Sequence, residues 1–269
     1  MAGIGDVLSI KMRGGTELPM LGFGTYQIPP RVAQSCVEQA LSLGYRAIDT
    51  AQCYGNEAQV GYAIKASGLS RQEVFVTTKT WTDGYRSTKA GIERSASLLG
   101  GYIDLLLVHE PTSDIEGMWR ALEEARDTGT AQAIGVSNFL EDSLGCLLRI
   151  ARVIPEVDQV ETHVLRQQRA LQGVLAESSI VLQSWSPLVC GRAGITRNPL
   201  LAQIARDHGK TPAQVALRWL IQRGIPLNVK SVHADRMAEN LSIFDFQLSL
   251  SEMEAVRQLD TNCSQFGWW

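Results

Sequence analysis

Eight short apolar or β-branched runs alternate with amphipathic stretches along most of this 269-residue chain, and this alternation limits the folds available to it. The runs that predict strands lie at 20–26, 46–50, 74–79, 103–109, 132–137, 156–161, 180–185 and 227–232. Between them, apolar residues recur with helical spacing, for example at 32–43, 88–99, 115–128 and 212–222. Strands that alternate with helices favour a parallel sheet in which the helices form the crossover connections.

Eight such units are the number that closes a barrel, so we predict an α/β protein with an (α/β)8 TIM barrel. An open doubly wound sheet is the alternative. It usually carries a G-x-G-x-x-G turn after its first strand, whereas Gly22-Phe-Gly24-Thr-Tyr-Gln27 lacks the third glycine. Residues 7–12 and 17–20, joined through paired glycines, predict an N-terminal β-hairpin that could plug the barrel floor. No linker divides the chain, so we expect a single domain over residues 1–269.

The composition argues against several classes of function. With 45% hydrophobic residues the chain can bury a large core, and it has no apolar run near the ~18 residues that span a bilayer. A formal net charge of -3 offers no basic field for nucleic acid. No secretory signal is apparent, which predicts a cytoplasmic protein. We expect reduced, buried thiols and no metal site, because no C-x-x-C pair occurs among Cys36, Cys53, Cys146, Cys190 and Cys263.

Polar side chains end three consecutive predicted strands. Asp49, Lys79 and His109 follow one another at intervals of about 30 residues, the usual length of one strand–helix unit. All three should therefore face the same mouth of the barrel, where such folds place their active sites. Tyr54, in the loop after Asp49, can reach the same space. Each of these residues alone is more often structural, but their regular placement favours a site.

The four residues suit one kind of chemistry. A tyrosine with a pKa of about 10 is a poor proton donor near neutrality, and we expect the Lys79 ammonium to lower the pKa of Tyr54 by favouring the phenolate. Asp49 would keep the lysine charged and oriented. His109 could donate a hydrogen bond to a substrate oxygen. The set predicts a general acid next to an electrophilic clamp, which would protonate a developing alkoxide.

Seven sequence blocks fall in order at the predicted strand ends, between about residues 20 and 250. They are Gly24-Thr-Tyr26, Asp49-Thr-Ala-x-x-Tyr54-Gly-Asn-Glu57, Thr78-Lys79-Thr-Trp81, Asp104-Leu-Leu-Leu-Val-His109, Gly135-Val-Ser-Asn-Phe139, Ser184-Trp-Ser-Pro-Leu188 and Lys230-Ser-x-x-x-x-Arg236-x-x-Glu239-Asn240. Together they resemble the aldo-keto reductase family, in its compact microbial branch that includes prostaglandin F synthases and 2,5-diketo-gluconate reductases. The resemblance implies a barrel that binds extended NADPH without a Rossmann domain and reduces aldehydes and ketones.

The resemblance also implies residue roles. Tyr54 becomes the general acid, Lys79 and Asp49 the pair that adjusts its pKa, and His109 the residue that orients the carbonyl. The implied cofactor contacts are Gly24, Thr25, Tyr26, Asp49, Ser137, Asn138, Gln159, Trp185, Ser186, Leu188, Lys230, Ser231, Val232, His233, Arg236, Glu239 and Asn240. Within this set Ser137, Asn138 and Gln159 would hold the nicotinamide carboxamide and Trp185 would stack on its ring. The implied substrate contacts are Tyr26, Tyr54, Trp81, His109 and Glu110.

Two alternatives concern the cofactor residues themselves. Without the resemblance, Ser137 or Asn138 would more often cap the helix expected to begin near Leu140. Likewise, without the resemblance Arg236 and Glu239 would fit a solvated, charged helix. With it, Lys230 and Arg236 can meet the extra negative charge of a 2′-phosphate, which favours NADPH over NADH.

The chain departs from the family pattern at a few positions. Glu110 follows the catalytic histidine where many relatives have tryptophan, and we hypothesise that its charge disfavours anionic substrates. His233 and Cys190 stand where small hydroxyl residues are frequent, which could alter cofactor affinity. The C-terminal tail is short, so we expect a rather open site. Terminal residues are often poorly ordered, so we do not rely on Phe266, Trp268 and Trp269 to cover the rim.

Other functions remain open at this point. A barrel glycoside hydrolase would use two facing carboxylates, for which Glu110 and Glu161 are candidates at strand ends. A metal-dependent hydrolase is less favoured, because the four histidines form no H-x-H or H-E-x-x-H pair. An NADPH-sensing regulatory subunit with little turnover is a further alternative. The expected partner is a small-molecule carbonyl substrate, with neither nucleic acid nor membrane, and the expected state is a monomer.

Overall fold

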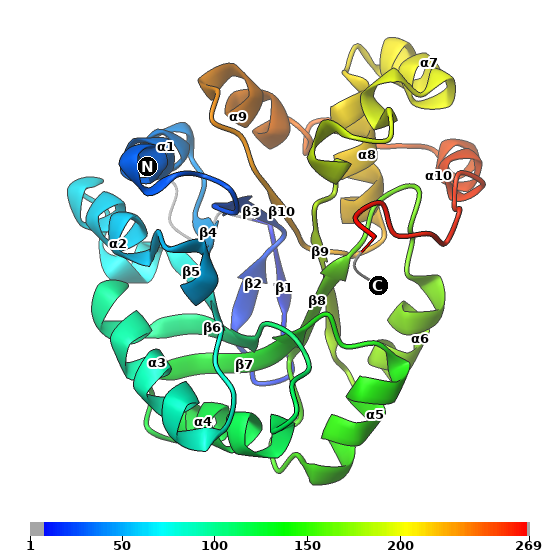
Figure 1. The fold of residues 1–269 in the computed structure, drawn as a ribbon. Helices are drawn as coiled ribbons and strands as arrows, with labels where there is room; N and C mark the ends of the chain where they lie inside the picture. Colours follow the sequence, from blue (N-terminus) through cyan, green and yellow to red (C-terminus); the bar gives the residue numbers. More distant parts are fainter. Residues whose placement is uncertain (1–7, 268–269) are drawn as a thin grey trace.

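The computed structural model describes residues 8–267, which form a closed barrel of parallel strands surrounded by helices (Figure 1). The barrel strands are β3 (Leu21–Gly24), β4 (Ala47–Asp49), β5 (Phe75–Thr80), β6 (Ile103–Val108), β7 (Ala131–Ser137), β8 (Val157–Glu161), β9 (Val181–Trp185) and β10 (Leu227–Val229). They pair in this order, and β10 returns to β3 and closes the ring. The predicted barrel is confirmed, and each observed strand overlaps its predicted run.

Helices connect successive strands and cover the outside of the barrel (Figure 1). They are α1 (Pro30–Leu43), α2 (Glu57–Ala66), α3 (Tyr85–Leu98), α4 (Ile115–Asp127), α5 (Glu141–Ile150), α6 (Arg169–Glu177), α7 (Pro199–His208), α8 (Pro212–Gln222), α9 (Ala234–Leu241) and α10 (Leu250–Arg257). No helix in the described part of the chain is long and apolar enough to cross a bilayer. In β6, Leu105 and Leu107 face the barrel interior, whereas Leu106 and Val108 pack under the helices, as strand alternation requires.

Helix α10 begins with a capping box that joins Ser249 and Glu252. Neither Ser137 nor Asn138 caps α5, which has Leu140 at its N-cap and no side-chain cap. The side chains of Ser137 and Asn138 are therefore not used as helix caps.

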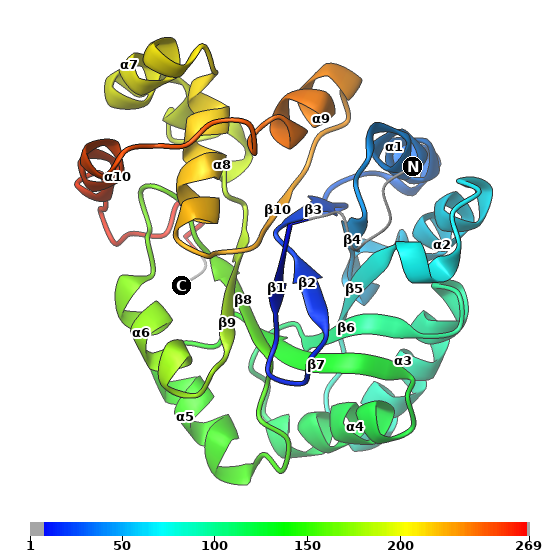
Figure 2. The same cartoon turned by 180° about the vertical axis from the view of Figure 1, so that it is seen from behind.

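The N-terminal hairpin is formed by β1 (Ser9–Lys11) and β2 (Glu17–Pro19), with Gly15 in the left-handed conformation that the turn requires. Its Met12 and Leu18 belong to one apolar cluster with side chains of the barrel interior, namely Ala47, Phe75, Leu105, Leu107, Ala133 and Val157. Figure 2 shows the hairpin lying across one end of the barrel. The hairpin closes the floor and leaves the opposite mouth open. Residue 7 of the predicted first strand lies outside the described residues.

The cysteines differ from the expectation of buried thiols. Cys36, on the inner face of α1, is the buried one, and the other four lie at exposed positions. All five are free thiols.

Candidate active site

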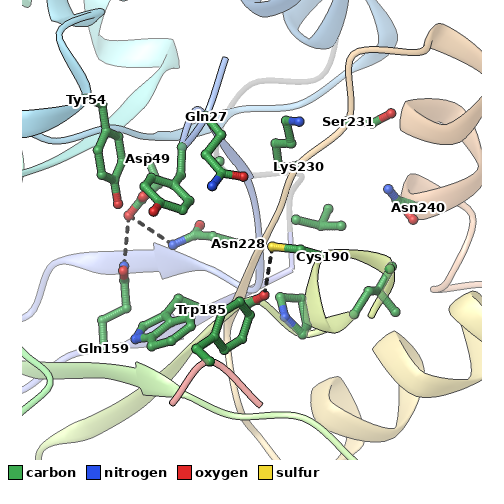
Figure 3. Close-up of a pocket in the computed structure, with 18 of the residues that line it drawn as sticks. Gln27, Asp49, Tyr54, Gln159, Trp185, Cys190, Asn228, Lys230, Ser231 and Asn240 are labelled. Atoms are coloured by element: carbon green, nitrogen blue, oxygen red, sulfur yellow. Dashed lines mark hydrogen bonds between the residues drawn. The ribbon is translucent and has the colours of Figure 1, made fainter. Parts of the chain in front are cut away.

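A cavity of about 930 Å³ opens at the carboxyl ends of the barrel strands (Figure 3). Its volume is at the upper end of the range typical of small-molecule sites. Of the residues that the sequence assigns to cofactor, substrate or catalysis, Thr25 and Lys79 do not line it. Further lining residues are Gln27, Cys53, Pro187, Cys190, Gly191, Thr196, Ala213, Asn228, Val229 and Phe266.

A buried ion pair lies beneath one end of this cavity. The Lys79 ammonium donates to Oδ1 of Asp49 at 2.6 Å and to the backbone oxygen of Thr50 at 3.0 Å. The other carboxylate oxygen of Asp49 accepts from the side-chain amides of Gln159 at 2.8 Å and Asn228 at 3.0 Å. Both charges are therefore satisfied although the Lys79 side chain is only 1% exposed.

The phenol of Tyr54 lies next to this pair. The Lys79 Nζ atom is 3.4 Å from the Tyr54 hydroxyl oxygen. Because an ammonium can only donate, the phenol oxygen accepts this contact and its own hydrogen is left to point to another acceptor. The Tyr54 side chain also lines the cavity.

The expectation that Lys79 lowers the pKa of Tyr54 is wrong in this structure. Burial and the nearby Asp49 carboxylate raise the pKa of Tyr54 well above its ordinary value, with smaller contributions in the same direction from Cys53 and Tyr26. Asp49 lies at contact distance from the lysine, so its charge largely cancels the field of the ammonium at the phenol. Tyr54 is therefore fully protonated at neutral pH.

His109 follows β6 and completes the cluster of four. Its ring lies 5.7 Å from that of Tyr54 and 5.1 Å from that of Trp81, measured between centroids. Burial, and secondarily the Lys79 charge, lower the pKa of His109 to about 3. The imidazole is thus neutral at physiological pH, with one N–H to donate.

Thr25, Asn56 and Thr50 hold the loops of this end together. The Asn56 amide donates to the backbone oxygens of Thr25 and Ile28, and its oxygen accepts from the hydroxyls of Thr50 and Thr25. Thr25 also donates to the backbone oxygen of Asp49. Thr25 was expected to contact the cofactor, but it is fully buried behind the cavity wall and acts as a brace between the first two barrel strands.

The three residues expected to hold a carboxamide meet at one wall of the cavity. Ser137 donates to the backbone oxygen of Gln159 at 2.8 Å, and Asn138 donates to that of His109 at 3.2 Å. The Asn138 side-chain oxygen in turn accepts from the indole N–H of Trp185 at 2.8 Å. Asn138 has a positive φ of 62°, a conformation that asparagine tolerates better than most residues.

The opposite end of the cavity, at β10 and α9, has a different character (Figure 3). Lys230 and Arg236 are exposed cations that form no ion pair with any residue in the range 8–267. The Asn240 amide is nearly buried, lines the cavity and has no hydrogen-bond partner within the same range. Two unpaired cations and an unsatisfied amide suit an anionic ligand with a polar base, which is the chemistry of a phosphorylated adenosine. The remaining predicted contacts here, Ser231, Val232, His233 and Glu239, also line the cavity.

The comparison with known proteins agrees with this geometry. The aldo/keto reductase family model matches residues 20–261, which is most of the chain. The chain belongs to this family. It is 41% identical over 257 residues to 9,11-endoperoxide prostaglandin H2 reductase of Trypanosoma cruzi, covering 93% of this chain and 91% of that protein. It is also 41% identical to glyoxal reductase of Bacillus subtilis, with 94% and 92% covered.

Solved structures of aldo-keto reductases share the whole fold. MGS-M4, an aldo-keto reductase from a deep-sea metagenome library, has a TM-score of 0.93 at 39% identity, with 95% of this chain and 96% of that chain covered. A variant of Gox0644 in complex with NADPH has a TM-score of 0.89 at 37% identity, with 97% and 94% covered. This chain is accordingly an oxidoreductase that acts on carbonyl groups and binds a nicotinamide cofactor.

Some residues of this reductase's site escaped the sequence analysis. Asn228 lies in β10, two residues before Lys230, and hydrogen-bonds to Asp49. The alternation of side chains along a strand could have identified Asn228 from the sequence, because it lies two positions before Lys230. Phe266 lines the cavity although the tail was not expected to cover the rim. Glu161, considered above as a hydrolase carboxylate, does not line the cavity.

Proposed function

We propose that this reductase uses NADPH to reduce aldehydes and ketones to alcohols, with Tyr54 as the proton donor. The observation that carries the proposal is the phenol of Tyr54 at the cavity edge, in contact with the ammonium of Lys79. When bound, NADPH supplies the hydride that reaches the carbonyl carbon. The protein's task is then to hold the carbonyl and deliver a proton to its oxygen.

Each residue of the cluster has a distinct part in that proton transfer. Tyr54 breaks its O–H bond as the carbonyl oxygen becomes an alkoxide, and a phenolate is left on the enzyme until solvent reprotonates it. Lys79 already donates to the phenol oxygen, so its hydrogen bond strengthens as negative charge appears there. Asp49 holds that ammonium in place. The neutral His109 donates its N–H to the same substrate oxygen and orients it.

We further propose NADPH rather than NADH as the cofactor. Lys230 and Arg236 support this choice, because neither has a counter-charge in the described part of the chain and both border the cavity end that suits adenosine. Trp185 offers an indole face for the nicotinamide, while Ser137, Asn138 and Gln159 would hold its carboxamide. Asn240 would accept or donate at the adenine.

The decisive experiment compares Tyr54→Phe with wild type. NADPH oxidation is followed with a panel of carbonyl compounds that includes glyoxal and methylglyoxal, the compounds in the names of two relatives. We expect Tyr54→Phe to lower kcat by roughly 10²–10⁴-fold, the contribution of a positioned general acid, while NADPH affinity is retained. Tyr62→Phe, on an exposed position of α2, is the matched control and should keep full activity. Full turnover in Tyr54→Phe would refute the assignment, and tight NADPH binding without turnover on any carbonyl would favour a sensing role instead.

We also propose that the reductase works as a monomer in the cytoplasm. The proposed catalytic cluster of Asp49, Tyr54, Lys79 and His109 is complete within one chain, so the chemistry requires no residue from a second copy. Four exposed free thiols suit a reducing compartment. Light scattering after gel filtration checks the first point, and fractionation of cells checks the second.

A further inference from the structure

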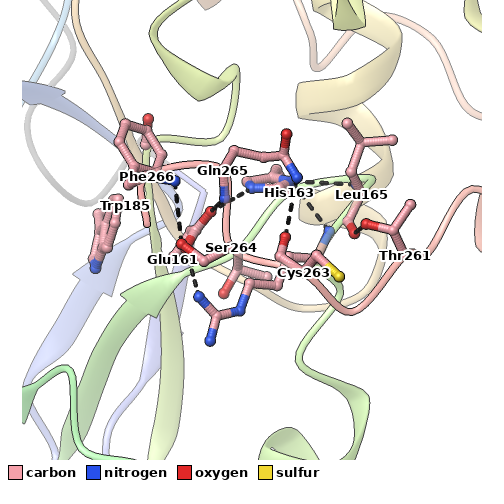
Figure 4. A network of polar contacts seen from close by, with 12 residues as sticks. Glu161, His163, Leu165, Trp185, Thr261, Cys263, Ser264, Gln265 and Phe266 are labelled. Atoms are coloured by element: carbon pink, nitrogen blue, oxygen red, sulfur yellow. Dashed lines mark hydrogen bonds and ion pairs between the residues drawn. The ribbon is translucent and has the colours of Figure 1, made fainter. Parts of the chain in front are cut away.

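The C-terminal tail of the reductase returns from α10 to the barrel mouth, beside β8 (Figures 1 and 4). Asp260 accepts the backbone N–H of Gln167 through its Oδ1 atom at 3.2 Å, and the backbone N–H and hydroxyl of Thr261 both donate to the backbone oxygen of Leu165, at 2.9 and 2.8 Å. Further along, the backbone N–H of Gln265 donates to Oε1 of Glu161 at 2.9 Å. The tail is thus tied to the loop after β8 by residues 260 and 261, and to the end of β8 itself by Gln265.

Glu161 is the last residue of β8 and is 1% exposed. Its Oε2 atom accepts from the Arg166 guanidinium at 2.5 Å, and its Oε1 atom lies 2.9 Å from Nε2 of His163. Nδ1 of His163 accepts from the backbone N–H groups of Leu165 and Arg166, so the hydrogen of the neutral ring sits on Nε2 and is donated to the carboxylate. One carboxylate therefore collects donors from its own loop and from the tail.

The charge of Glu161 is stable over the working range of pH. Burial acts to raise the pKa of this carboxyl, but hydrogen bonds from His163, the Gln265 amide, Ser264 and Arg166 outweigh it and bring the pKa to about 2. The carboxylate that receives the tail is ionised at neutral pH.

Phe266 follows the anchored Gln265 directly and reaches the active-site cavity. Its ring packs edge to face on that of Trp185, with centroids 5.1 Å apart, and the Arg192 guanidinium lies 5.6 Å from the Phe266 ring centroid. Trp185 is in turn hydrogen-bonded to Asn138. The anchor at Glu161 is therefore linked through two residues of the tail to the wall proposed to hold the nicotinamide.

We propose that Glu161 is a positioning residue: it fastens the tail so that Phe266 forms a wall of the substrate site against Trp185. The inference rests on the proposed function, since it assigns that wall to the carbonyl site. Glu161 acts only through the tail and touches no reacting atom. Loss of the anchor should weaken substrate binding and leave the proton-transfer cluster intact.

The test uses Glu161→Gln, Phe266→Ala and the double variant. The amide keeps the volume of the carboxylate, but its NH₂ group must face either Arg166 or the Gln265 N–H, both of which are donors. Glu156→Gln is the matched control. Glu156 precedes the same strand at its other end, is 2% exposed and accepts the backbone N–H of Gly14 in the floor hairpin at 2.7 Å.

For an aromatic aldehyde, we expect Glu161→Gln and Phe266→Ala each to raise KM by roughly two- to tenfold, the range that an edge-to-face ring contact contributes, with kcat within about twofold of wild type. The double variant should resemble either single variant, because both remove the same wall. Glu156→Gln should lower the melting temperature without raising KM. Additive KM effects, or an equal KM rise in Glu156→Gln, would overturn the proposal.

A second measurement separates this inference from the proposed function. Amide hydrogen exchange of residues 261–267 needs no catalysis, and the Gln265 N–H should lose protection in Glu161→Gln but keep it in Glu156→Gln. If the wild type reduced no carbonyl compound, the proposed function would fail while exchange still tested the anchor. Unchanged protection in Glu161→Gln would refute the anchor even in an active enzyme.

Discussion

Removing the negative charge of Asp49 should destabilise the whole barrel, not only the active site. Asp49 and Lys79 are 2.6 Å apart and both nearly buried, so at an effective dielectric constant of about 20 the attraction between unit charges is about 6 kcal/mol. Desolvation of the two groups offsets much of this, but Asp49→Asn leaves the Lys79 ammonium buried without its counter-charge. An amide at position 49 must also turn its NH₂ group toward Lys79 or toward the donors of Gln159 and Asn228.

We therefore expect Asp49→Asn to lower the free energy of unfolding by about 3–5 kcal/mol, the usual cost of breaking a buried pair from one side. The double variant Asp49→Asn/Lys79→Met should recover most of the loss, because it removes the unpaired charge and leaves the amide oxygen free for Gln159 and Asn228. Both variants should be inactive, so stability is the informative readout. Urea unfolding followed by circular dichroism, with slopes compared between variants, measures it. A loss below 1 kcal/mol in the single variant, or no recovery in the double variant, would refute the reasoning.

Two further predictions concern the charges around the substrate. Glu110 lines the cavity, has no ion-pair partner in the described range and has its pKa raised by burial. We expect Glu110→Gln to raise kcat/KM for a carboxylated aldehyde relative to a neutral one by up to about fivefold, which is the effect of two unit charges 4 Å apart in water. Glu116→Gln, exposed at the start of α4, is the control, and an unchanged ratio in Glu110→Gln contradicts the hypothesis. His109 has a pKa of about 3 when folded, so between pH 6.5 and 3 the unfolded chain binds a proton that the folded chain does not, and the unfolding free energy falls as pH falls through this window. Unfolding at pH 7, 5 and 4 should give a shallower decline in His109→Gln than in wild type, and parallel declines would contradict the assigned cause.

Much of the site could be predicted because the barrel converts sequence spacing into position. Asp49, Lys79 and His109 come from consecutive strands, and every parallel strand of a closed barrel ends at the same mouth. A 30-residue interval therefore specifies a place in space without any knowledge of side-chain packing. The floor hairpin was predictable for a similar reason, since a local turn pairs its two strands.

Other features depend on distances between side chains in space, which the intervals between residues in the sequence do not give. The pKa of Tyr54 rises because the phenol is buried and because the Asp49 carboxylate lies nearby, and both facts follow from packing. The tail reaches the cavity through a hydrogen bond between residues 104 positions apart, which no local pattern encodes. Glu161 illustrates the limit best: its position at a strand end suggested a catalytic carboxylate, but its partners make it an anchor.

Strand β8 connects the floor of the barrel to the active-site mouth. Val157, Gln159 and Glu161 alternate along it and share one face, in the layered arrangement typical of such barrels. Val157 packs with Met12 and Leu18 of the floor hairpin, Gln159 hydrogen-bonds Asp49 beneath the site, and Glu161 receives the tail at the mouth. A shift of this strand along its axis would therefore move floor, catalytic pair and tail together. The three layers are coupled through one rigid element, so variants at its two ends, Glu156→Gln and Glu161→Gln, can separate the contribution of the floor to stability from the contribution of the tail to substrate binding.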